Sequence, residues 1–361
     1  MNIVQIVSGK GVNGAIRHCL DLTCELARRG HRVLLVHAPG AWVANAPLPA
    51  GVESFETSFR RRLPEFRRVA AAFRAREIDV VNSHSSSAHF FSVLLARAYR
   101  LPKVATCHMP FFQPHWWWND RVIAPTLATA RFQRWFNAVP ARRIDVIPYF
   151  IDGARLQPAR SRDVVRRELG VADDDFLILC VGKISARKNQ ALLVRAFYAL
   201  RQRGIRATLA LVGGIDERYR RKVEEALRAG GASDDVKLLG LRRDIPDLLA
   251  ASDCFALPSE REVMPVACWE AMAAGVPVVL SDFGGVREWL QDGEHAIVVH
   301  RGDRAALTDA LGNLVADPEL RRRLTAAARR KIASEYSPDA CVPRILECYG
   351  DARRQRLGWS G

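Results

Sequence analysis

Apolar residues along the chain fall into two series, in which short apolar runs alternate with longer segments whose apolar positions recur at helical spacing. The short runs predict buried strands, and the longer segments predict amphipathic helices. In the first series, strands are expected at 3–7, 31–37, 78–84, 103–108, 121–126 and 143–150, and helices at 16–29, 66–76 and 90–99. In the second series, strands are expected at 176–184, 208–214, 236–240, 253–259, 276–282 and 296–299, and helices at 189–203, 217–229, 267–274, 286–290, 304–334 and 338–352. This alternation is typical of parallel sheets, so the sequence predicts an α/β fold of two doubly wound domains in tandem.

The length of 361 residues also fits two domains of ordinary size. A Pro- and Arg-rich stretch that starts at Gly153 predicts the linker between them. We expect an N-terminal domain over 1–152, a linker over 153–162, a C-terminal domain over 163–345 and a C-terminal helix over 346–361 that returns to the N-terminal domain. In such sheets ligands bind at the carboxyl ends of the strands, so a cleft between the two domains is the expected site.

The apolar content excludes several other classes of protein. No apolar run reaches the roughly 18 uncharged residues of a membrane span. The first residues, MNIVQIVSGKG, lack the basic region and long apolar core of a signal peptide. The eight cysteines are scattered singly, which predicts reduced thiols rather than disulfides or a zinc site. We therefore expect a cytoplasmic protein without a metal or another cofactor.

The formal net charge of +15 leaves three kinds of partner open. Nucleic acid, an anionic membrane surface and small anions would each be attracted to it. The charge is equally compatible with arginines on solvated faces that have no partner. No RRM, KH or zinc-knuckle pattern is present, so we do not expect nucleic acid as a partner.

Two glutamates mark the most informative segment, residues 258–279. Glu262 lies in an acidic loop, and Glu270 lies eight positions later, inside a predicted helix. If the segment between them is mostly helical, they are about 12 Å apart, which exceeds the roughly 5–9.5 Å of a glycosidase carboxyl pair. Between them, the backbone at Met264, Pro265 and Val266 forms a helix start that favours an anion. Alternatively, Glu262 is simply solvated and Glu270 pairs with an arginine.

Two lysines mark a second segment, VGKISARKNQ at 181–190. Lys183 and Lys188 follow a strand end and lead into a helix. Two cations at such a turn suit a diphosphate leaving group, because charge builds up on it as its bond breaks. The spacing is not that of a P-loop, and a solvated basic loop is the alternative.

Glycines supply two weaker signals. Gly284 and Gly285 precede a predicted helix, where a bare backbone can hold an anion, although Gly-Gly is also an ordinary turn. Gly14, near the first helix, could admit a phosphate. The surrounding residues do not fit G-x-G-x-x-G, which argues against a dinucleotide oxidoreductase.

Two histidines, His84 and His108, stand at the ends of predicted strands in the first domain. Side chains at strand ends reach the expected cleft. A single histidine is more often structural than catalytic, but two at equivalent strand ends favour contact of one, His108, with the substrate.

Taken together, these segments resemble glycosyltransferase family 4 over nearly the whole chain. EREVMPVACWEAMAAGVPVV, VGKISARKNQALLVRAF, LRRDIPDLLAASDCFALPS and SDFGGVREWLQDGEHAIVV are similar to the C-terminal domain of that family. NGAIRHCLDLTCELARRGHRVLLV and the histidine pair are similar to its N-terminal domain. The resemblance implies a GT-B fold, with two Rossmann-like domains facing across a cleft, and metal-free transfer that retains the anomeric configuration.

The resemblance also implies roles for individual residues. Glu262 and Glu270 match the family's E-x7-E motif, which implies that Glu262 lies near the donor sugar and Glu270 near the ribose. Lys183 and Lys188 match its basic pair on the donor diphosphate, and His108 matches a histidine near the reacting sugar. The expected catalytic residues are His108, Lys188 and Glu262; the donor-binding residues are Gly14, Lys183, Lys188, Met264, Pro265, Val266, Glu270, Gly284 and Gly285; and the acceptor-side residues are His84 and His108.

Three departures from the family pattern leave the identity of the transferred sugar open. Asn13 replaces a usual glycine, Pro148-Tyr149-Phe150 replaces Pro-Asn-Gly, and Val263-Met264-Pro265 replaces Gly-Phe-Gly. We expect a donor that is a UDP-sugar, with GDP-mannose as the second choice, and an acceptor that is a glycan or a lipid-linked sugar of the bacterial envelope. A nucleotide-sugar epimerase and a catalytically silent nucleotide-sugar-binding protein remain the alternatives.

A final expectation is peripheral docking on an anionic membrane surface at the inner face of the cytoplasmic membrane. Residues 59–73 read as a short basic amphipathic helix, and residues 111–118 are rich in Phe and Trp. Alternatively, these aromatic residues line a pocket for a soluble acceptor or pack at the hinge. The residues expected to contact the membrane are Arg60, Arg61, Arg62, Arg67, Arg68, Trp116, Trp117 and Trp118.

Overall fold

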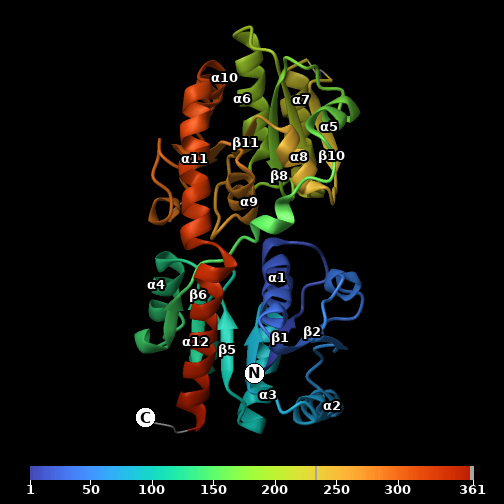
Figure 1. Ribbon diagram of the computed structural model, residues 1–361, viewed down its shortest axis with the longest axis vertical. Helices are drawn as coiled ribbons and strands as arrows, with labels where there is room; N and C mark the ends of the chain where they lie inside the picture. The colour runs from blue at the N-terminus through green and yellow to red at the C-terminus, as the bar shows by residue number, and fades with distance from the viewer. Residues whose placement is uncertain (232–233, 284, 358–361) are drawn as a thin grey trace. The chain divides into compact units, whose positions relative to one another are not determined.

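The computed structural model describes residues 1–231, 234–283 and 285–357 (Figure 1). The chain forms two compact units. The first contains residues 1–150 and the C-terminal segment that starts at Pro338, and the second runs from Ile151 to Ser337. Each unit is built on a parallel sheet, as the alternating sequence pattern predicts.

The first unit has a seven-stranded sheet in the order β3-β2-β1-β4-β5-β6-β7, with every neighbouring pair parallel. Its strands are β1 (Asn2–Val7), β2 (Arg32–His37), β3 (Val52–Glu56), β4 (Val80–Ser83), β5 (Lys103–Thr106), β6 (Arg121–Ala124) and β7 (Ile144–Val146). Its α-helices are α1 (Gly14–Arg28), α2 (Leu63–Arg74), α3 (Ser86–Tyr99), α4 (Leu127–Trp135) and α12 (Pro338–Leu357). Because all strands are parallel, their carboxyl ends share one edge of the sheet and their amino ends share the other.

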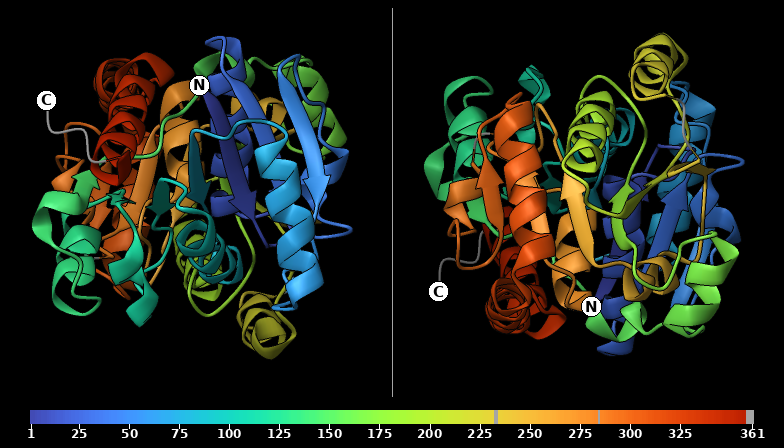
Figure 2. Two further views of the ribbon diagram at one scale, coloured as in Figure 1. Left: turned by 90° about the horizontal axis from the view of Figure 1, so that it is seen from below. Right: turned by 90° about the horizontal axis from the view of Figure 1, so that it is seen from above.

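Helices cover both faces of this sheet (Figure 2). Alternate residues of a strand point to opposite faces, so Ile3 of β1 packs in one core and Val4 in the other. The Ile3 core includes side chains of α1 and α12, and the Val4 core includes side chains of α2 and α3. The sheet is therefore buried on both sides, as a doubly wound fold requires.

Helix α12 belongs to the first unit over its whole length. The boundary expected at residue 346 falls inside this helix, eight residues after its start at Pro338. Cys341, Val342 and Ile345 are buried in the core of the first unit, which explains why the helix joins that unit from its first turn.

The second unit repeats the plan, with six parallel strands in the order β10-β9-β8-β11-β12-β13. Relative to its first strand this is the classic order 3-2-1-4-5-6. The strands are β8 (Phe176–Val181), β9 (Ala207–Val212), β10 (Val236–Gly240), β11 (Cys254–Leu257), β12 (Val278–Ser281) and β13 (Ile297–Val299). The α-helices are α5 (Arg162–Glu168), α6 (Gln190–Gln202), α7 (Glu217–Ala229), α8 (Ile245–Ala251), α9 (Val266–Ala274), α10 (Arg304–Ala316) and α11 (Pro318–Glu335).

The stretch expected as a linker, 153–162, is instead packed on the second unit. Arg160 forms ion pairs with Asp247 at 2.8 Å and Glu168 at 2.5 Å, and also with Asp244. The backbone N–H of Ala159 donates to Asp247 at 2.6 Å. The Pro- and Arg-rich composition predicted a linker here, but its charged groups form ion pairs and hydrogen bonds with other residues of the second unit.

Helix α2 does not offer a free apolar face. Val69, Ala70 and Phe73 are buried in the core of the first unit, and the ring of Phe66 stacks on Phe91 at 4.5 Å. The prediction that residues 59–73 lie in a membrane interface is therefore wrong, because the sheet already covers the apolar side of the helix. Arg60, Arg61, Arg62, Arg67 and Arg68 are exposed on the remaining surface. No helix within the described residues is long and apolar enough to span a membrane.

Candidate functional site

In the second unit, two glycines bring the ends of β8 and β9 close together. Gly182 has φ = 144° and Gly213 has φ = 140°, conformations that L side chains rarely adopt. A Cβ on Gly213 would lie 2.3 Å from the carbonyl oxygen of Gly182, and a Cβ on Gly182 would meet the Lys188 side chain at 2.6 Å. The bare backbone of Gly182 thus lets Lys188 lie across the carboxyl end of the sheet.

Lys188 is joined to the predicted motif glutamate. Its Nζ lies 2.9 Å from Oε1 of Glu262, and Nη1 of Arg187 lies 2.5 Å from Oε2. The Glu262 side chain is only 8% exposed. Burial by itself raises the pKa of Glu262, but Lys188 and Arg187 outweigh it and lower the pKa below its usual value. The carboxylate is therefore ionised, and it occupies a place between two cations.

The loop that carries Lys188 is fixed by side chains that the sequence analysis did not single out. Gln190 accepts from the backbone N–H of Ser185 at 3.1 Å and donates to the carbonyl of Lys183 at 3.2 Å. Asn189, with φ = 51°, donates to Glu260 at 2.6 Å. The sequence signal for this support is the polar run that follows Lys188, but which groups it contacts depends on the fold.

Lys183 lies in a different environment from Lys188. Its side chain is 65% exposed and forms an ion pair with Asp216 at 3.1 Å. Lys188 is nearly buried, at 9% exposure. The two lysines of the motif are thus one exposed surface cation and one nearly buried cation.

The second glutamate, Glu270, lies within α9, and this helix begins only at Val266. Glu262 is outside the helix, so the spacing of about 12 Å expected for a mostly helical segment has no basis here. Pro265 is the N-cap residue, and no side chain caps this end of the helix. Met264 is buried beside it. Among the described residues, the amino end of α9 therefore has no side-chain capping hydrogen bond, and a helix start favours an anion.

The glycine pair after β12 gives weaker support for anion binding than the sequence predicted. Gly284 lies outside the described residues. Gly285 has φ = 89° and precedes a single 3-10 turn, η5 (Val286–Glu288), instead of the expected α-helix. One turn has a small dipole, so anion binding here would depend on the bare backbone alone.

In the first unit, His84 and His108 follow β4 and β5 and are directly bonded to each other. Nδ1 of His84 lies 3.0 Å from Nε2 of His108. Nε2 of His84 lies 2.6 Å from Oε1 of Gln5, and Nδ1 of His108 lies 2.7 Å from the hydroxyl of Tyr149. The strand-end histidines thus form one hydrogen-bonded chain with residues of β1 and of the segment after β7.

An amide oxygen only accepts, so a hydrogen bond from His84 to Gln5 requires the proton of His84 on Nε2. A neutral His84 then accepts at Nδ1 from His108, and Tyr149 donates its hydroxyl proton to His108. This arrangement requires Nδ2 of Asn82, which lies 3.0 Å from the same Nε2, to direct its two protons to Gln5 and Tyr349. Burial lowers the pKa of both histidines well below the usual value, so both rings are neutral. His84 is fully buried, so the predicted contact of His84 with an acceptor is wrong, and its ring is instead bonded to His108.

A third buried histidine, His18 of α1, lies beside this chain. Its ring centroid is 4.4 Å from that of Tyr149, and its Nδ1 has no hydrogen-bond partner within the described part of the chain. Burial lowers its pKa from 6.5 to about 3. Gly14, at the start of the same helix, is exposed, and the side chain of Asn13 caps this end by accepting from Ile16 N at 3.1 Å.

We expect these neutral histidines to make stability depend on pH. Below pH 6.5 the unfolded chain binds a proton at His18 that the folded chain does not, so stability is lost as pH falls. Between pH 6.5 and 5.0 the loss is roughly 2 kcal/mol for such a histidine. Urea denaturation at pH 7.5 and 5.0 measures it: His18→Gln should reduce the difference by about that amount, and Gln157→Ala, which removes an exposed side chain that does not titrate, should not. An unchanged pH dependence in His18→Gln would contradict this assignment.

The aromatic segment 111–118 is divided between core and surface. Trp116 is 6% exposed and stacks on His89 at 4.2 Å. The prediction that Trp116 contacts a membrane is therefore wrong, because its ring fills the core. Trp117 and Trp118 are 48% and 45% exposed.

Both halves of the chain are similar to known glycosyltransferase families. A family model described as Glycosyltransferase Family 4 matches residues 12–155, and one described as Glycosyl transferases group 1 matches residues 161–331. The two matches fall on the two parallel-sheet units in turn.

Individual relatives agree with these family models. The D-inositol 3-phosphate glycosyltransferase of Salinispora arenicola is 32% identical over 250 residues, which cover 64% of this chain and 55% of that protein. The chain thus spans about half the length of this kind of relative. The lipopolysaccharide core biosynthesis glycosyltransferase LpsD of Rhizobium meliloti is 28% identical over 354 residues, covering 94% of this chain and 96% of LpsD. The crystal structure of HepE from Anabaena with UDP and glucose has a TM-score of 0.83 at 22% identity and covers 96% of this chain and 99% of HepE, which supports the GT-B fold. The chain belongs to the family 4 and group 1 glycosyltransferases, with the GT-B fold.

Proposed function

We propose that this chain transfers a glycosyl residue from a nucleoside diphosphate sugar to an acceptor hydroxyl. The observation that carries the proposal is the cation pair around Glu262, with Lys188 at 2.9 Å and Arg187 at 2.5 Å, at the carboxyl end of the sheet. The uncapped start of α9 follows in the same segment. Both features favour a diphosphate. A UDP-sugar is the first choice of donor, supported by UDP in the HepE structure, and GDP-mannose is the second.

The proposed reaction retains the anomeric configuration. The bond from the sugar's anomeric carbon to the diphosphate oxygen breaks, and a new bond to the acceptor oxygen forms on the same face. The acceptor proton passes to the departing diphosphate, and the products are an α-glycoside and a free nucleoside diphosphate. Lys188 and Lys183 stabilise the charge that builds up on the leaving group, so no metal or enzyme nucleophile takes part.

On the acceptor side, we propose that His108 orients the reacting groups as a neutral ring. Both of its ring nitrogens are bonded within the unit, to His84 and Tyr149. It therefore has no proton ready to transfer, which agrees with a route in which the diphosphate takes the acceptor proton. The proposed acceptor is a glycan or lipid-linked sugar of the bacterial envelope, as the name of LpsD suggests for that relative.

A donor screen tests the proposal. Because a ligand that binds only the folded state raises the melting temperature, UDP-sugars and GDP-mannose are compared by thermal shift. The stabilising donor is then incubated with acceptor oligosaccharides, with and without EDTA, and the anomeric configuration of the product is read by NMR. Transfer with retention, unaffected by EDTA, is expected. An altered nucleotide sugar formed without any acceptor would show an epimerase instead.

We also propose that the first unit docks on an anionic membrane, through a surface other than α2. Phe111, Phe112, Trp135 and Phe136 are between 53% and 71% exposed. Asn137 connects the two segments that carry them, since it donates to the carbonyl of Phe111 at 3.0 Å and accepts from Gln113 N at 2.7 Å. Exposed Arg131 and Arg134 of α4 flank these rings. Aromatic rings beside arginines suit the interface of an anionic bilayer.

Vesicle sedimentation measures this docking. We expect the protein to bind vesicles with phosphatidylglycerol, to bind neutral vesicles at least tenfold more weakly, and to be released by high salt. Replacement of Phe112 and Trp135 by serine should lower the bound fraction severalfold. Leu241→Ser, which removes an 83% exposed apolar side chain from the second unit, is the matched control. Failure to bind phosphatidylglycerol vesicles at low salt would end this part of the proposal.

A further inference from the structure

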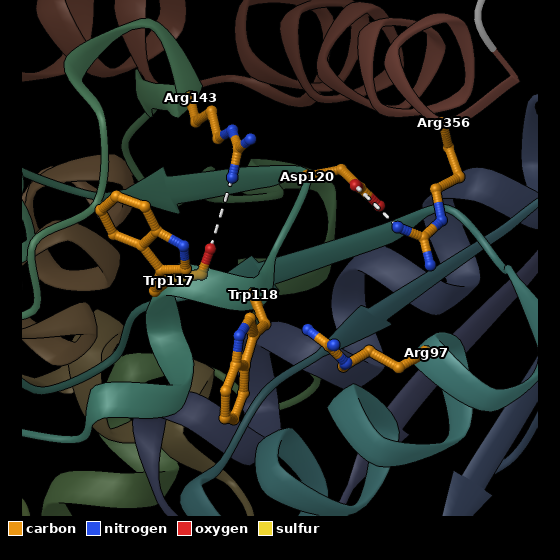
Figure 3. A pocket seen from close by; sticks show the side chains of 6 residues that line it. All are labelled: Arg97, Trp117, Trp118, Asp120, Arg143 and Arg356. Atoms are coloured by element: carbon orange, nitrogen blue, oxygen red, sulfur yellow. Dashed lines mark hydrogen bonds and ion pairs between the residues drawn. The ribbon is translucent and has the colours of Figure 1, made fainter.

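A basic pocket lies in the first unit, away from His84 and His108. It has a volume of about 320 Å³ and is shown in Figure 3. Its lining residues come from the end of α3, the segments before β6 and β7, and the end of α12: Arg97, Trp117, Trp118, Asp120, Arg143 and Arg356. The segments before β6 and β7 lie at the amino ends of those strands, whereas His84 and His108 follow carboxyl ends. The pocket is therefore on the opposite edge of the same sheet.

The charges of this pocket are not balanced. Asp120 is the one carboxylate among the described residues that line it, and it already accepts from the backbone N–H of Lys103 at 2.8 Å and faces Arg356 at 3.9 Å. Within the described part of the chain, no Asp or Glu forms an ion pair with Arg97 or Arg143. Like charges gathered in a concave site repel one another, and a bound anion would relieve that repulsion.

The three guanidinium groups are nevertheless held in place by uncharged groups. Arg143 donates to the carbonyls of Trp117 at 3.3 Å and Asn119 at 3.5 Å, and its Nε and Nη2 donate to the side-chain oxygen of Gln355 at 3.0 and 3.3 Å. Arg356 donates to the carbonyl of Ala96 at 3.4 Å. The guanidinium carbon of Arg97 lies 5.1 Å from the centre of the Trp118 ring. Each guanidinium has five N–H donors, so these contacts leave most donors of Arg97 and Arg356, and fewer of Arg143, available for a ligand. A site with oriented donors needs little reorganisation to bind an anion.

We propose that this pocket binds a phosphate monoester carried by a sugar. Arginine forks match the oxygen geometry of phosphate, and three of them offset its two negative charges beside Asp120. The volume exceeds that of an inorganic ion and falls at the lower end of pockets for small organic ligands, roughly 300–1,000 Å³. The half-exposed rings of Trp117 and Trp118 offer flat apolar surfaces to the sugar carbons.

This inference rests on the proposed function in one respect, namely that the acceptor is a glycan. Because the pocket is on the edge of the sheet opposite to His108, the phosphorylated sugar that binds there is not the one that reacts. The pocket holds a distant phosphorylated part of the acceptor and so raises its local concentration. Acceptors without a phosphate should then react with an unchanged kcat and a higher KM.

Direct binding of glucose 6-phosphate, measured by titration calorimetry at low salt, tests the site. Saturable binding is expected, with no binding of glucose and at least tenfold weaker binding of inorganic phosphate. Arg97→Gln with Arg143→Gln should weaken binding at least tenfold. Arg60→Gln with Arg67→Gln, which removes the same charge from exposed positions of the same unit, should not. Arg97→Gln alone keeps the test valid if the loss of Arg143 disturbs folding, since Arg97 is an exposed side chain.

Three results would overturn the assignment. They are the absence of saturable glucose 6-phosphate binding, an equal loss in the control pair, and binding of phosphatidic acid vesicles with no binding of soluble sugar phosphate. The last result would show that the ligand of the pocket is a lipid headgroup. UDP binding is measured in the same variants and should be unchanged, so failure of this site is distinguishable from failure of the proposed donor site.

Discussion

Replacement of Lys188 by alanine is expected to lower the turnover number for glycosyl transfer by a factor of about 100 to 1,000. Its ammonium group lies across Gly182 at the carboxyl end of the second sheet, with only 9% of its surface exposed. A fixed donor directed at developing charge in a site of low water content typically contributes that much to the rate. Steady-state kinetics with the stabilising donor and a reactive acceptor give the number directly.

A control must separate this effect from a loss of folding. Lys188→Ala removes one of the two cations that hold the buried Glu262 carboxylate, and loss of a buried partner costs about 3–5 kcal/mol when no other cation remains. Arg187 remains at 2.5 Å from Glu262, so we expect a smaller cost, measurable by thermal denaturation. Lys183→Ala removes an exposed cation, so it should leave stability unchanged and reduce turnover less. Near-normal transfer by a folded Lys188→Ala variant would overturn the assignment of this lysine to the leaving group.

Replacement of Glu270 by alanine is expected to weaken binding of free UDP by a factor of about 10 to 100. A carboxylate that accepts hydrogen bonds from ribose hydroxyls contributes about 1.5–3 kcal/mol, and the ribose is present in both the donor and the product nucleotide. The affinity for the donor should fall by the same factor. Titration calorimetry with UDP and with the donor measures both.

Glu262 serves as the matched comparison, with glutamine as the replacement. Glu262→Ala would also release Lys188 and Arg187, which the carboxylate holds, so its effect would mix two causes. Glu262→Gln keeps a hydrogen-bond acceptor near both cations and should mainly weaken binding of the intact donor. Equal loss of UDP affinity in Glu270→Ala and Glu262→Gln would contradict the separation of ribose and sugar contacts.

The periodic pattern of the sequence was sufficient to predict both parallel sheets. Every strand of the second unit was expected within a few residues of its observed position, because fully buried strands such as β8 and β9 are continuous apolar runs. The edge strand β3 was missed, since its residues are largely exposed and carry little apolar signal. The short helices α5 and α8, of seven residues each, were missed because two turns define no clear period.

Sequence alone also selected Lys188, Glu262 and Glu270 as candidate site residues of the second unit, because they stand in local segments of recognisable spacing. Only the tertiary structure joined Lys188 to Glu262, which are 74 positions apart, and added Arg187 to the pair. Such ion pairs depend on the order of strands in the sheet. A local sequence pattern does not predict that order.

In the first unit, the difference between what the sequence predicted and what only the fold showed is larger. Sequence placed His84 and His108 at strand ends, but only the fold showed that Gln5 and Tyr149 bond to them and leave His84 buried. Amphipathic periodicity in α2 was detected correctly, yet periodicity does not say whether a sheet or a membrane covers the apolar face. The basic pocket was not predicted because its residues come from four segments that are distant in the sequence. Sequence determined which side chains are available, and the packing of helices on the sheet decided which of them meet, because burial and charge pairing are properties of contacts between segments.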